Sequence, residues 1–200
     1  MGHYEQRKLE TLAARAASRK LDSTRHKCFI SYHADDTDEV ATFLDNFGTE
    51  FIAKTIGVTD EDDFIDSNDT GYVMDQIRTK YLGDSSVTIL LVGQCTWARR
   101  YVDWEIYSSL RDSKHSKVNG LLAIQLPSAS TAGGKLPDRA SDNVIRDSSG
   151  VNIGYARYKS YPDSTQSLRG WIGDAFSART GRNHLIENAR ARRLRSASCS

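Results

Sequence analysis

The run from Val87 to Val92 constrains the fold of this 200-residue chain more than any other feature. All of its residues except Thr88 are apolar, which is typical of a strand buried on both faces of a parallel sheet. Segments with helical spacing lie between this run and the other candidate strands. Alternating strands and helices joined by right-handed crossovers place helices on both faces of a sheet. The sequence therefore predicts an α/β fold with an open, mainly parallel sheet.

The individual elements follow from apolar periodicity and turn residues. The expected strands are 27–32, 51–58, 87–92, 121–126 and a partly exposed edge strand at 155–161. The expected helices cover 4–21, the stripe from Val40 to Phe47, 69–82, 99–111 and a segment capped at 162–164, with loops at 59–69 and 128–150. This organisation predicts an N-terminal amphipathic helix in 1–26, a main domain in 27–180 and a basic extension in 181–200 that ends in disorder.

Charge and cysteine usage exclude several classes of protein. The net charge of +1 gives the whole molecule no strong attraction to nucleic acid or membranes. Twelve acidic residues against one base in 35–69, with basic ends, would suit head-to-tail self-association or an acidic partner, although a solvated tail explains the basic end as well. Three cysteines without metal spacing argue against a disulfide framework, and no apolar run spans a bilayer. We expect a cytoplasmic protein without a membrane anchor.

Common cofactor and nucleophile motifs are missing from the sequence. No G-x-G-x-x-G follows the first strand, and no G-x-S-x-G elbow is present. The segment 133–136 lacks both the first glycine and the hydroxyl residue of a phosphate loop. The five histidines are scattered without metal-ligand spacing. We therefore expect neither a bound metal nor a bound cofactor.

The stretch from Thr96 to Ile106 is the strongest candidate for chemistry. If a helix begins near Tyr101, then Tyr101 and Glu105 are four residues apart and share one face. Ligands of open α/β sheets bind where strands end and helices begin, so a carboxylate among aromatic rings there is a candidate catalytic group. On position alone, a solvated Glu on a helix is the simpler interpretation.

Two motifs carry a family resemblance. The segment Phe29-Ile30-Ser31-Tyr32-His33-Ala34-Asp35-Asp36 resembles the opening strand and loop of TIR domains, and the arrangement that ends at Glu105 resembles the TIR helix bearing the catalytic glutamate. The combination of residues 86–93 and 96–106 is most similar to TIR-like subunits of Thoeris antiviral defence systems. The resemblance covers roughly residues 27–176 and implies a flavodoxin-like fold. It also implies an enzyme that cleaves NAD, its substrate, at the nicotinamide–ribose bond.

The resemblance implies roles for particular residues. Glu105 would stabilise the ribosyl cation that forms as nicotinamide departs, as carboxylates do in glycosidases. The residues expected near the substrate are Ser31, Tyr32 and His33 for the ribose or nicotinamide, Trp97 and Trp104 for stacking on a base, and Arg99, Arg100 and Tyr101 for the rest of the dinucleotide. For His33 a surface loop position, for the tryptophans a packing role, and for the arginines a solvated helix start remain alternatives.

The outcome of the reaction remains open at this stage. Water would give a glycohydrolase, whereas attack by the substrate's own adenine or a ribose hydroxyl would give an ADP-ribosyl cyclase, and pocket shape decides between them. Among defence members, the resemblance implies a cyclised signalling nucleotide that diffuses to a separate effector. The alternative function is a non-catalytic TIR-like protein-interaction module. A nucleic-acid partner is disfavoured because the terminal arginines are not interleaved with aromatic residues.

Overall fold

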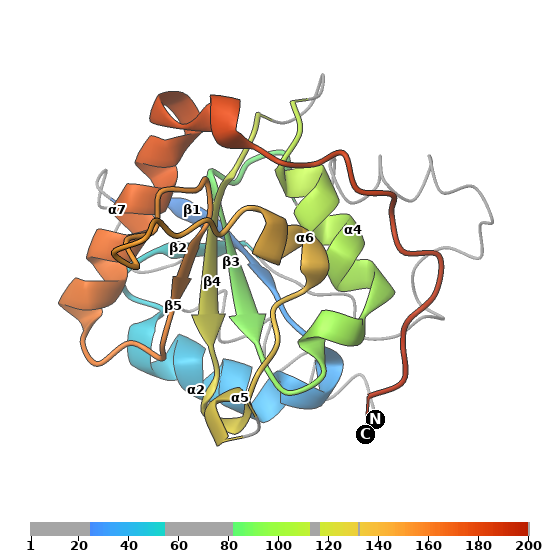
Figure 1. Cartoon of the computed structure of the whole chain (residues 1–200). Coiled ribbons are helices and arrows are strands. Elements are labelled where there is room, and N and C mark those ends of the chain that lie inside the picture. Colours follow the sequence, from blue (N-terminus) through green and yellow to red (C-terminus); the bar gives the residue numbers. More distant parts are fainter. Residues whose placement is uncertain (1–24, 55–81, 113–116, 132, 200) are drawn as a thin grey trace.

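A five-stranded parallel sheet forms the centre of the protein. The computed structural model describes residues 25–54, 82–112, 117–131 and 133–199 (Figure 1). The strands follow the order β2-β1-β3-β4-β5, and each neighbouring pair is parallel. Their bounds are β1 (Lys27–Ser31), β2 (Ile52–Lys54), β3 (Val87–Val92), β4 (Gly120–Gln125) and β5 (Arg157–Lys159). The predicted α/β class with a parallel sheet is confirmed.

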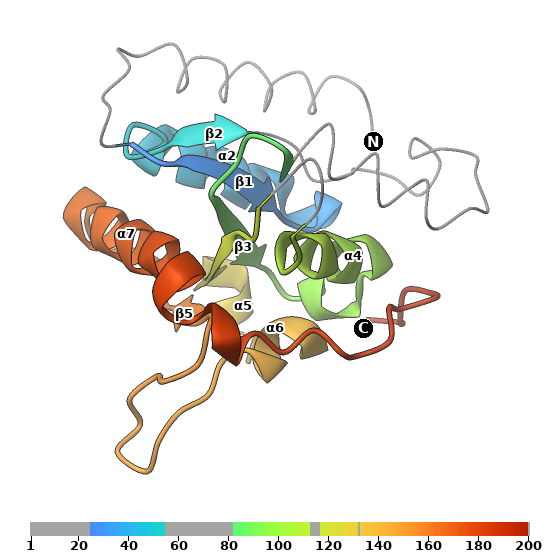
Figure 2. The same cartoon turned by 90° about the horizontal axis from the view of Figure 1, so that it is seen from above.

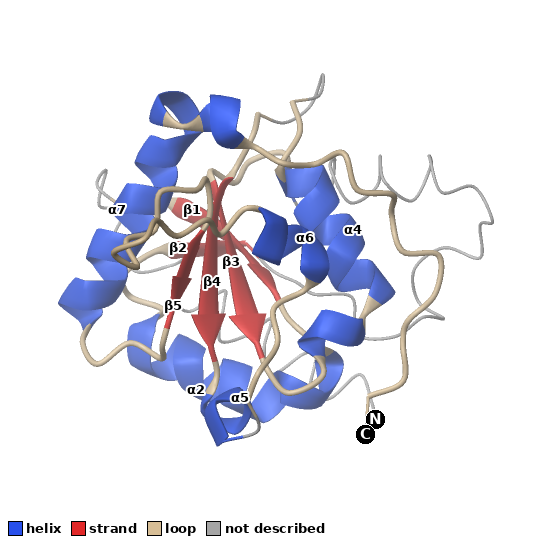
Figure 3. Ribbon diagram, in the orientation of Figure 1, coloured by secondary structure: helices blue, strands red, loops and turns tan. Residues whose placement is uncertain are grey.

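Helices cover both faces of this sheet, as the alternating pattern predicts (Figure 3). Their bounds are α2 (Thr37–Phe47), α4 (Arg100–Ser109), α5 (Pro127–Thr131), α6 (Asp138–Asp142) and α7 (Thr165–Gly181), with short 3₁₀ helices η1 (Ala34–Asp36), η3 (Thr96–Ala98) and η4 (Asn183–Leu185). The predicted cap of the last long helix is confirmed, because the Ser164 hydroxyl accepts from the Ser167 backbone N–H of α7 at 3.1 Å. The helix expected at 4–21, the loop at 59–69 and the helix at 69–82 except Leu82 lie outside the described residues.

Two apolar layers hold the helices to the sheet. On one face, α2 and α7 pack against β1, β3 and β4 through residues such as Phe43 and Ile172. On the other face, α4 and α6 lie over β3 and β4, and Val102 and Ile106 supply the α4 contacts (Figure 2). The strand β3 lies between the layers, and all of its residues are buried, which agrees with its mainly apolar sequence.

Three predicted segments in the second half of the chain differ from the structure. The expected strand at 155–161 shortens to β5, because Tyr155 and Ala156 are fully buried in the α4-side layer before the strand begins. The Tyr155 hydroxyl donates to the Asn119 carbonyl at 2.7 Å, which satisfies its polar end there. The strand expected at 121–126 is displaced by one residue, to β4. The loop expected at 128–150 contains α6 and most of α5.

The C-terminal extension corrects two predictions. Residues 187–199 run along the outer side of α4 instead of being disordered at their end (Figure 1). Cys95, just after β3, forms a disulfide with Cys199, whereas the sequence argued against disulfides. The two cysteines are 104 residues apart, so only the tertiary fold brings them together. Among the described residues, no helix has the length and apolar character needed to cross a membrane.

Gly120 permits the close approach of α7 to the sheet, and its substitution is expected to separate them. A Cβ atom at this position would overlap the Ala175 carbonyl of α7. We expect Gly120→Ala to lower the free energy of unfolding by about 1 to 3 kcal/mol, as other overpacked cores do. Urea denaturation measures this loss. The control is Gly170→Ala on α7, where the added methyl group meets open space, and equal losses in the two variants would contradict the packing explanation.

Candidate functional site

The carboxyl ends of β1 and β3 form the natural ligand position of this sheet. From β1 the chain leads to β2 on one side, whereas β3, β4 and β5 extend the sheet on the other side. The strand order therefore reverses between β1 and β3. Open α/β sheets bind ligands in the crevice outside the strand ends at such a switch point.

Glu105 lies close to this position and is buried. Its side chain comes from α4, only 2% of the residue is exposed, and its Oε2 accepts a hydrogen bond of 2.6 Å from the Ser31 hydroxyl at the end of β1. A buried carboxylate is unfavourable unless polar groups compensate it, and a hydroxyl donating to a charged acceptor makes a strong, short hydrogen bond. The structure thus brings together two of the residues that the sequence placed in the site.

The orientation of Glu105 follows from the packing of α4. Val102, Ile106 and Leu110 bury one stripe of the helix against β3 and β4. Ser109, one turn beyond Glu105, shares a hydrogen bond of 2.7 Å with the Thr88 hydroxyl of β3. These contacts orient α4 so that the face bearing Glu105 points toward the end of β1. The apolar residues that make them follow the spacing of an amphipathic helix.

A second carboxylate lies at the same edge. The Thr96 hydroxyl accepts from the Gly93 N–H at 2.8 Å and donates to Asp36 Oδ2 at 3.1 Å, which ties the turn after β3 to η1. A Cβ atom on Gly93 would overlap the Asp36 carboxylate, so the glycine is required for this approach. Burial raises the pKa of Asp36 to about 6, against the smaller opposing effect of the Thr96 hydrogen bond.

His33 belongs to the same group of titratable side chains. Its pKa is lowered by burial and by the positive charge of Arg99, although Asp35 acts in the opposite direction. The His33 Nε2 atom lies 3.1 Å from Asp35 Oδ2. A lowered pKa favours a neutral imidazole, which has both a donor and an acceptor to offer a ribose hydroxyl.

The raised pKa of Asp36 predicts a pH dependence of stability. The folded state holds the Asp36 proton more tightly than the unfolded chain does, so its contribution is full below the ordinary pKa of 3.8 and is lost as pH rises to about 6. We expect Asp36→Asn, whose amide oxygen still accepts from Thr96, to increase stability at pH 7 by about 1 kcal/mol, after allowance for solvent screening. The gain should disappear at pH 3.5.

Denaturation curves at the two pH values measure this difference. The control is Asp38→Asn, at an exposed position of α2, which is expected to change stability little at either pH. A gain for Asp36→Asn that is equal at both pH values would contradict the assignment.

Most of the other predicted site residues contact neighbouring parts of the protein. Tyr32 is 4% exposed and lies in the apolar layer with α2, and the Trp97 ring lies under the Lys135 ammonium at 4.5 Å. Arg100 and Tyr101 are joined, since Arg100 Nη2 donates to the Tyr101 hydroxyl at 2.8 Å. Trp104 donates from Nε1 to the Arg193 carbonyl at 2.8 Å, which agrees with a packing role. Substrate contacts by these residues stay predictions.

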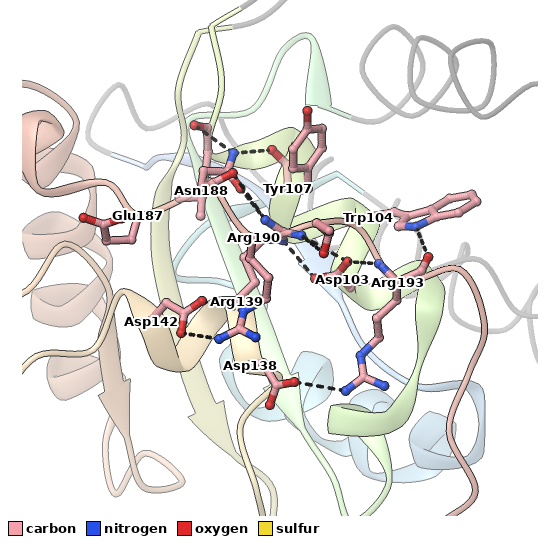
Figure 4. Close-up of polar contacts among 12 residues, drawn as sticks. Asp103, Trp104, Tyr107, Asp138, Arg139, Asp142, Glu187, Asn188, Arg190 and Arg193 are labelled. Atoms are coloured by element: carbon pink, nitrogen blue, oxygen red, sulfur yellow. Dashed lines mark hydrogen bonds and ion pairs between the residues drawn. The ribbon is translucent and has the colours of Figure 1, made fainter.

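Several neighbouring interactions were missed from the sequence. Asp103 and Arg139 form a buried ion pair at 2.8 Å, and Asn188 and Arg193 of the 187–199 segment hydrogen-bond to it (Figure 4). Nothing in the sequence pairs Asp103 with a residue 36 positions away. Asp36 lies in the quoted motif, but no role in the site was expected of it. Within the described residues, no group of three or more His, Cys, Asp or Glu side chains is placed to hold a metal.

Comparison with known families shows which family the chain belongs to. The family model described as "Thoeris protein ThsB, TIR-like domain" matches residues 29–131, which is just over half of the 200 residues. The chain belongs to this family. The matched region contains Ser31, Asp36 and Glu105 and ends in α5, so α6, α7 and residues 187–199 lie beyond it. A search of curated proteins finds no match.

The resemblance inferred from the two motifs is therefore confirmed, together with the TIR-like fold. Membership of the Thoeris ThsB family supports a TIR-type role in antiphage defence. The residues that carried the resemblance, in β1 and in α4, are the ones that the fold brings into hydrogen-bond contact.

Proposed function

We propose that this Thoeris TIR-like protein consumes NAD by breaking the bond between nicotinamide and ribose. The observation that supports the proposal best is the buried Glu105 carboxylate, held by Ser31 at the switch point of the sheet. A buried carboxylate beside a ligand-binding edge is characteristic of a functional group.

The chemistry requires little else from the protein. Nicotinamide carries a positive charge while it is bonded to ribose, and it leaves as a neutral molecule with the electrons of the broken bond. The positive charge then develops on the ribosyl C1′, where the Glu105 carboxylate stabilises it electrostatically. No general acid is needed, so the proposed chemistry requires one catalytic carboxylate, Glu105.

The second step determines the product. Attack on C1′ by water, with loss of a proton, gives ADP-ribose, whereas attack by the adenine or a ribose hydroxyl of the same molecule gives a cyclised ADP-ribose. We propose cyclisation. The family comparison supports a role in Thoeris defence, and the resemblance implies a cyclised nucleotide that diffuses to a separate effector. Self-association through the uneven charge distribution belongs to the same proposal.

Incubation of the purified full chain with NAD tests this function. Chromatography should show nicotinamide and a cyclised ADP-ribose in equal amounts, and linear ADP-ribose in their place would identify a glycohydrolase. The assay uses both oxidised and thiol-reduced protein, because the Cys95–Cys199 disulfide joins the C-terminal end to the loop after β3. If neither form releases nicotinamide, the proposal is wrong and the protein-interaction module is favoured.

Removal of the hydroxyl that holds Glu105 should slow the reaction. Ser31→Ala deletes a hydrogen bond to a charged group, worth about 1.5 to 3 kcal/mol, so we expect kcat to fall by about 10-fold to 100-fold with little change in KM. The matched control is Ser109→Ala, which deletes a buried hydroxyl contact of the same helix to Thr88 but not to Glu105. Equal losses of kcat in the two variants would show that Ser31 acts only through stability.

A further inference from the structure

The segment 187–199, here called the strap, lies along the whole length of α4. Asn188 donates to the Tyr107 carbonyl near the end of the helix at 3.1 Å, and the Ala197 N–H donates to the Ala98 carbonyl before its start at 2.9 Å. Figure 4 shows the middle of this path, where the backbone of Arg193 contacts both Asp103 and Trp104. The strap thus ends beside the loop that follows β3, at the carboxyl edge of the sheet.

The strap is held by polar contacts and one covalent bond. None of its residues is buried, and its largest apolar residue, Leu194, is 79% exposed. Its ion pairs, Arg190 with Asp142 and Arg193 with Asp138, involve partly exposed groups and are therefore weak. Because the strap buries no apolar side chain, the Cys95–Cys199 disulfide is the main restraint on its end.

The strap occupies the donors at the start of α4. The Ser196 hydroxyl accepts from the Arg100 N–H at 3.2 Å, and the Leu194 carbonyl accepts from Arg100 Nη1 at 3.3 Å. The other terminal nitrogen, Nη2, donates to Tyr101. A backbone N–H at a helix start and an arginine fork are the groups that proteins use to bind phosphates. In this structure, the Ser196 hydroxyl and the Leu194 carbonyl of the strap accept from these donors.

We propose that the strap is a redox-controlled inhibitor of the site. While the Cys95–Cys199 disulfide is closed, the strap keeps Arg100 and Tyr101 from the pyrophosphate of NAD, and reduction by a thiol releases them. The inference rests on the proposed function, because it takes NAD as the ligand of the site. Tyr101 lies four residues before Glu105, on the same face of α4, and Arg100 contacts Tyr101. The strap therefore blocks binding next to the catalytic carboxylate without covering the Ser31 contact.

The switching step is an ordinary thiol–disulfide exchange. A thiolate of a small-molecule or protein reductant attacks one sulfur of the disulfide, and the other sulfur leaves as a thiolate that takes up a proton. A second reductant thiol then resolves the mixed disulfide. Two electrons enter the protein, Cys95 and Cys199 become thiols, and the reductant is oxidised to its own disulfide. Cys199 lies on a partly exposed segment, which gives the reductant access.

Binding of ADP-ribose to full-length Glu105→Gln tests the strap separately from turnover. Calorimetry should show a dissociation constant at least tenfold lower after reduction with dithiothreitol and removal of the reductant under argon. The matched variant Glu105→Gln/Cys199→Ser should bind as the reduced protein does and should not respond to dithiothreitol. Mass spectrometry of alkylated thiols confirms the redox state of each sample.

The possible outcomes distinguish the two proposals. Affinity that is equal in the oxidised and reduced states, or no binding in either state, would overturn the strap as an inhibitor. A reduced state that binds more weakly would also overturn it, because the strap would then support the site. Redox-dependent binding without nicotinamide release by the reduced wild-type protein would sustain the strap and overturn the proposed NAD cleavage.

Discussion

We expect Arg139→Met to lower the free energy of unfolding by about 3 to 5 kcal/mol, the range typical when one partner of a buried ion pair is removed. Arg139 is fully buried, and its Nε and Nη2 atoms donate to the two carboxylate oxygens of Asp103 at 2.8 and 3.3 Å. Its other contacts hold the strap, through Asn188 at 2.9 Å and the Ala191 carbonyl at 3.2 Å. The substitution leaves the Asp103 charge buried and also loosens the strap.

Two further variants distinguish this explanation from a general loss of packing. The double variant Arg139→Met/Asp103→Leu removes both charges, so it should recover most of the lost stability. Arg190→Met breaks the more exposed pair with Asp142 and should cost at most about 1 kcal/mol. Denaturation of all three proteins in urea measures these differences. A double variant less stable than Arg139→Met would contradict the account of an uncompensated charge.

We expect Glu105→Gln to reduce kcat for nicotinamide release by about 1000-fold, close to 4 kcal/mol of lost transition-state stabilisation. The amide has the shape of the carboxylate, and its oxygen still accepts from Ser31, so the fold and the affinity for NAD are expected to persist. Only the negative charge opposite the developing ribosyl cation is lost. The effect should therefore appear in kcat and leave KM nearly unchanged.

Steady-state kinetics of the reduced protein separate these parameters. Glu39→Gln is a suitable control, since Glu39 of α2 is a carboxylate with two hydrogen bonds to Ser128, at 3.0 and 2.8 Å, and has no contact with Glu105 among those described. It should retain the wild-type kcat. If Glu105→Gln keeps more than about a tenth of the wild-type kcat, electrostatic stabilisation by this residue is refuted.

The centre of the fold was predictable because its residues carry strong local patterns. The almost entirely apolar run of β3 predicts a buried strand, and the amphipathic stripe of α4 predicts a helix. The resemblance carried by the two motifs led to Ser31 and Glu105. The contact between these two residues joins positions 74 apart, and parallel strand topology brings them together once the fold class is known.

The parts that the sequence did not predict depend on distant tertiary contacts. The order of residues 187–199 comes from Arg139, Asp103 and the disulfide, none of which has a local pattern. Tyr155 looked like an edge-strand residue because tyrosines alternate there, but the α4-side layer buries it. In both cases, burial by a remote segment outweighs the periodicity within the segment itself.

The central claim is that Glu105 stabilises a ribosyl cation as nicotinamide leaves. The most direct test is a single-turnover comparison of NAD carrying hydrogen or deuterium at the ribose C1′, with the reduced wild-type protein and nicotinamide release as the readout. Our account predicts faster release from the hydrogen form, because bending of the C1′–H bond loosens as that carbon becomes cationic. Equal rates for the two substrates, with bond cleavage shown to limit the turnover, would contradict it.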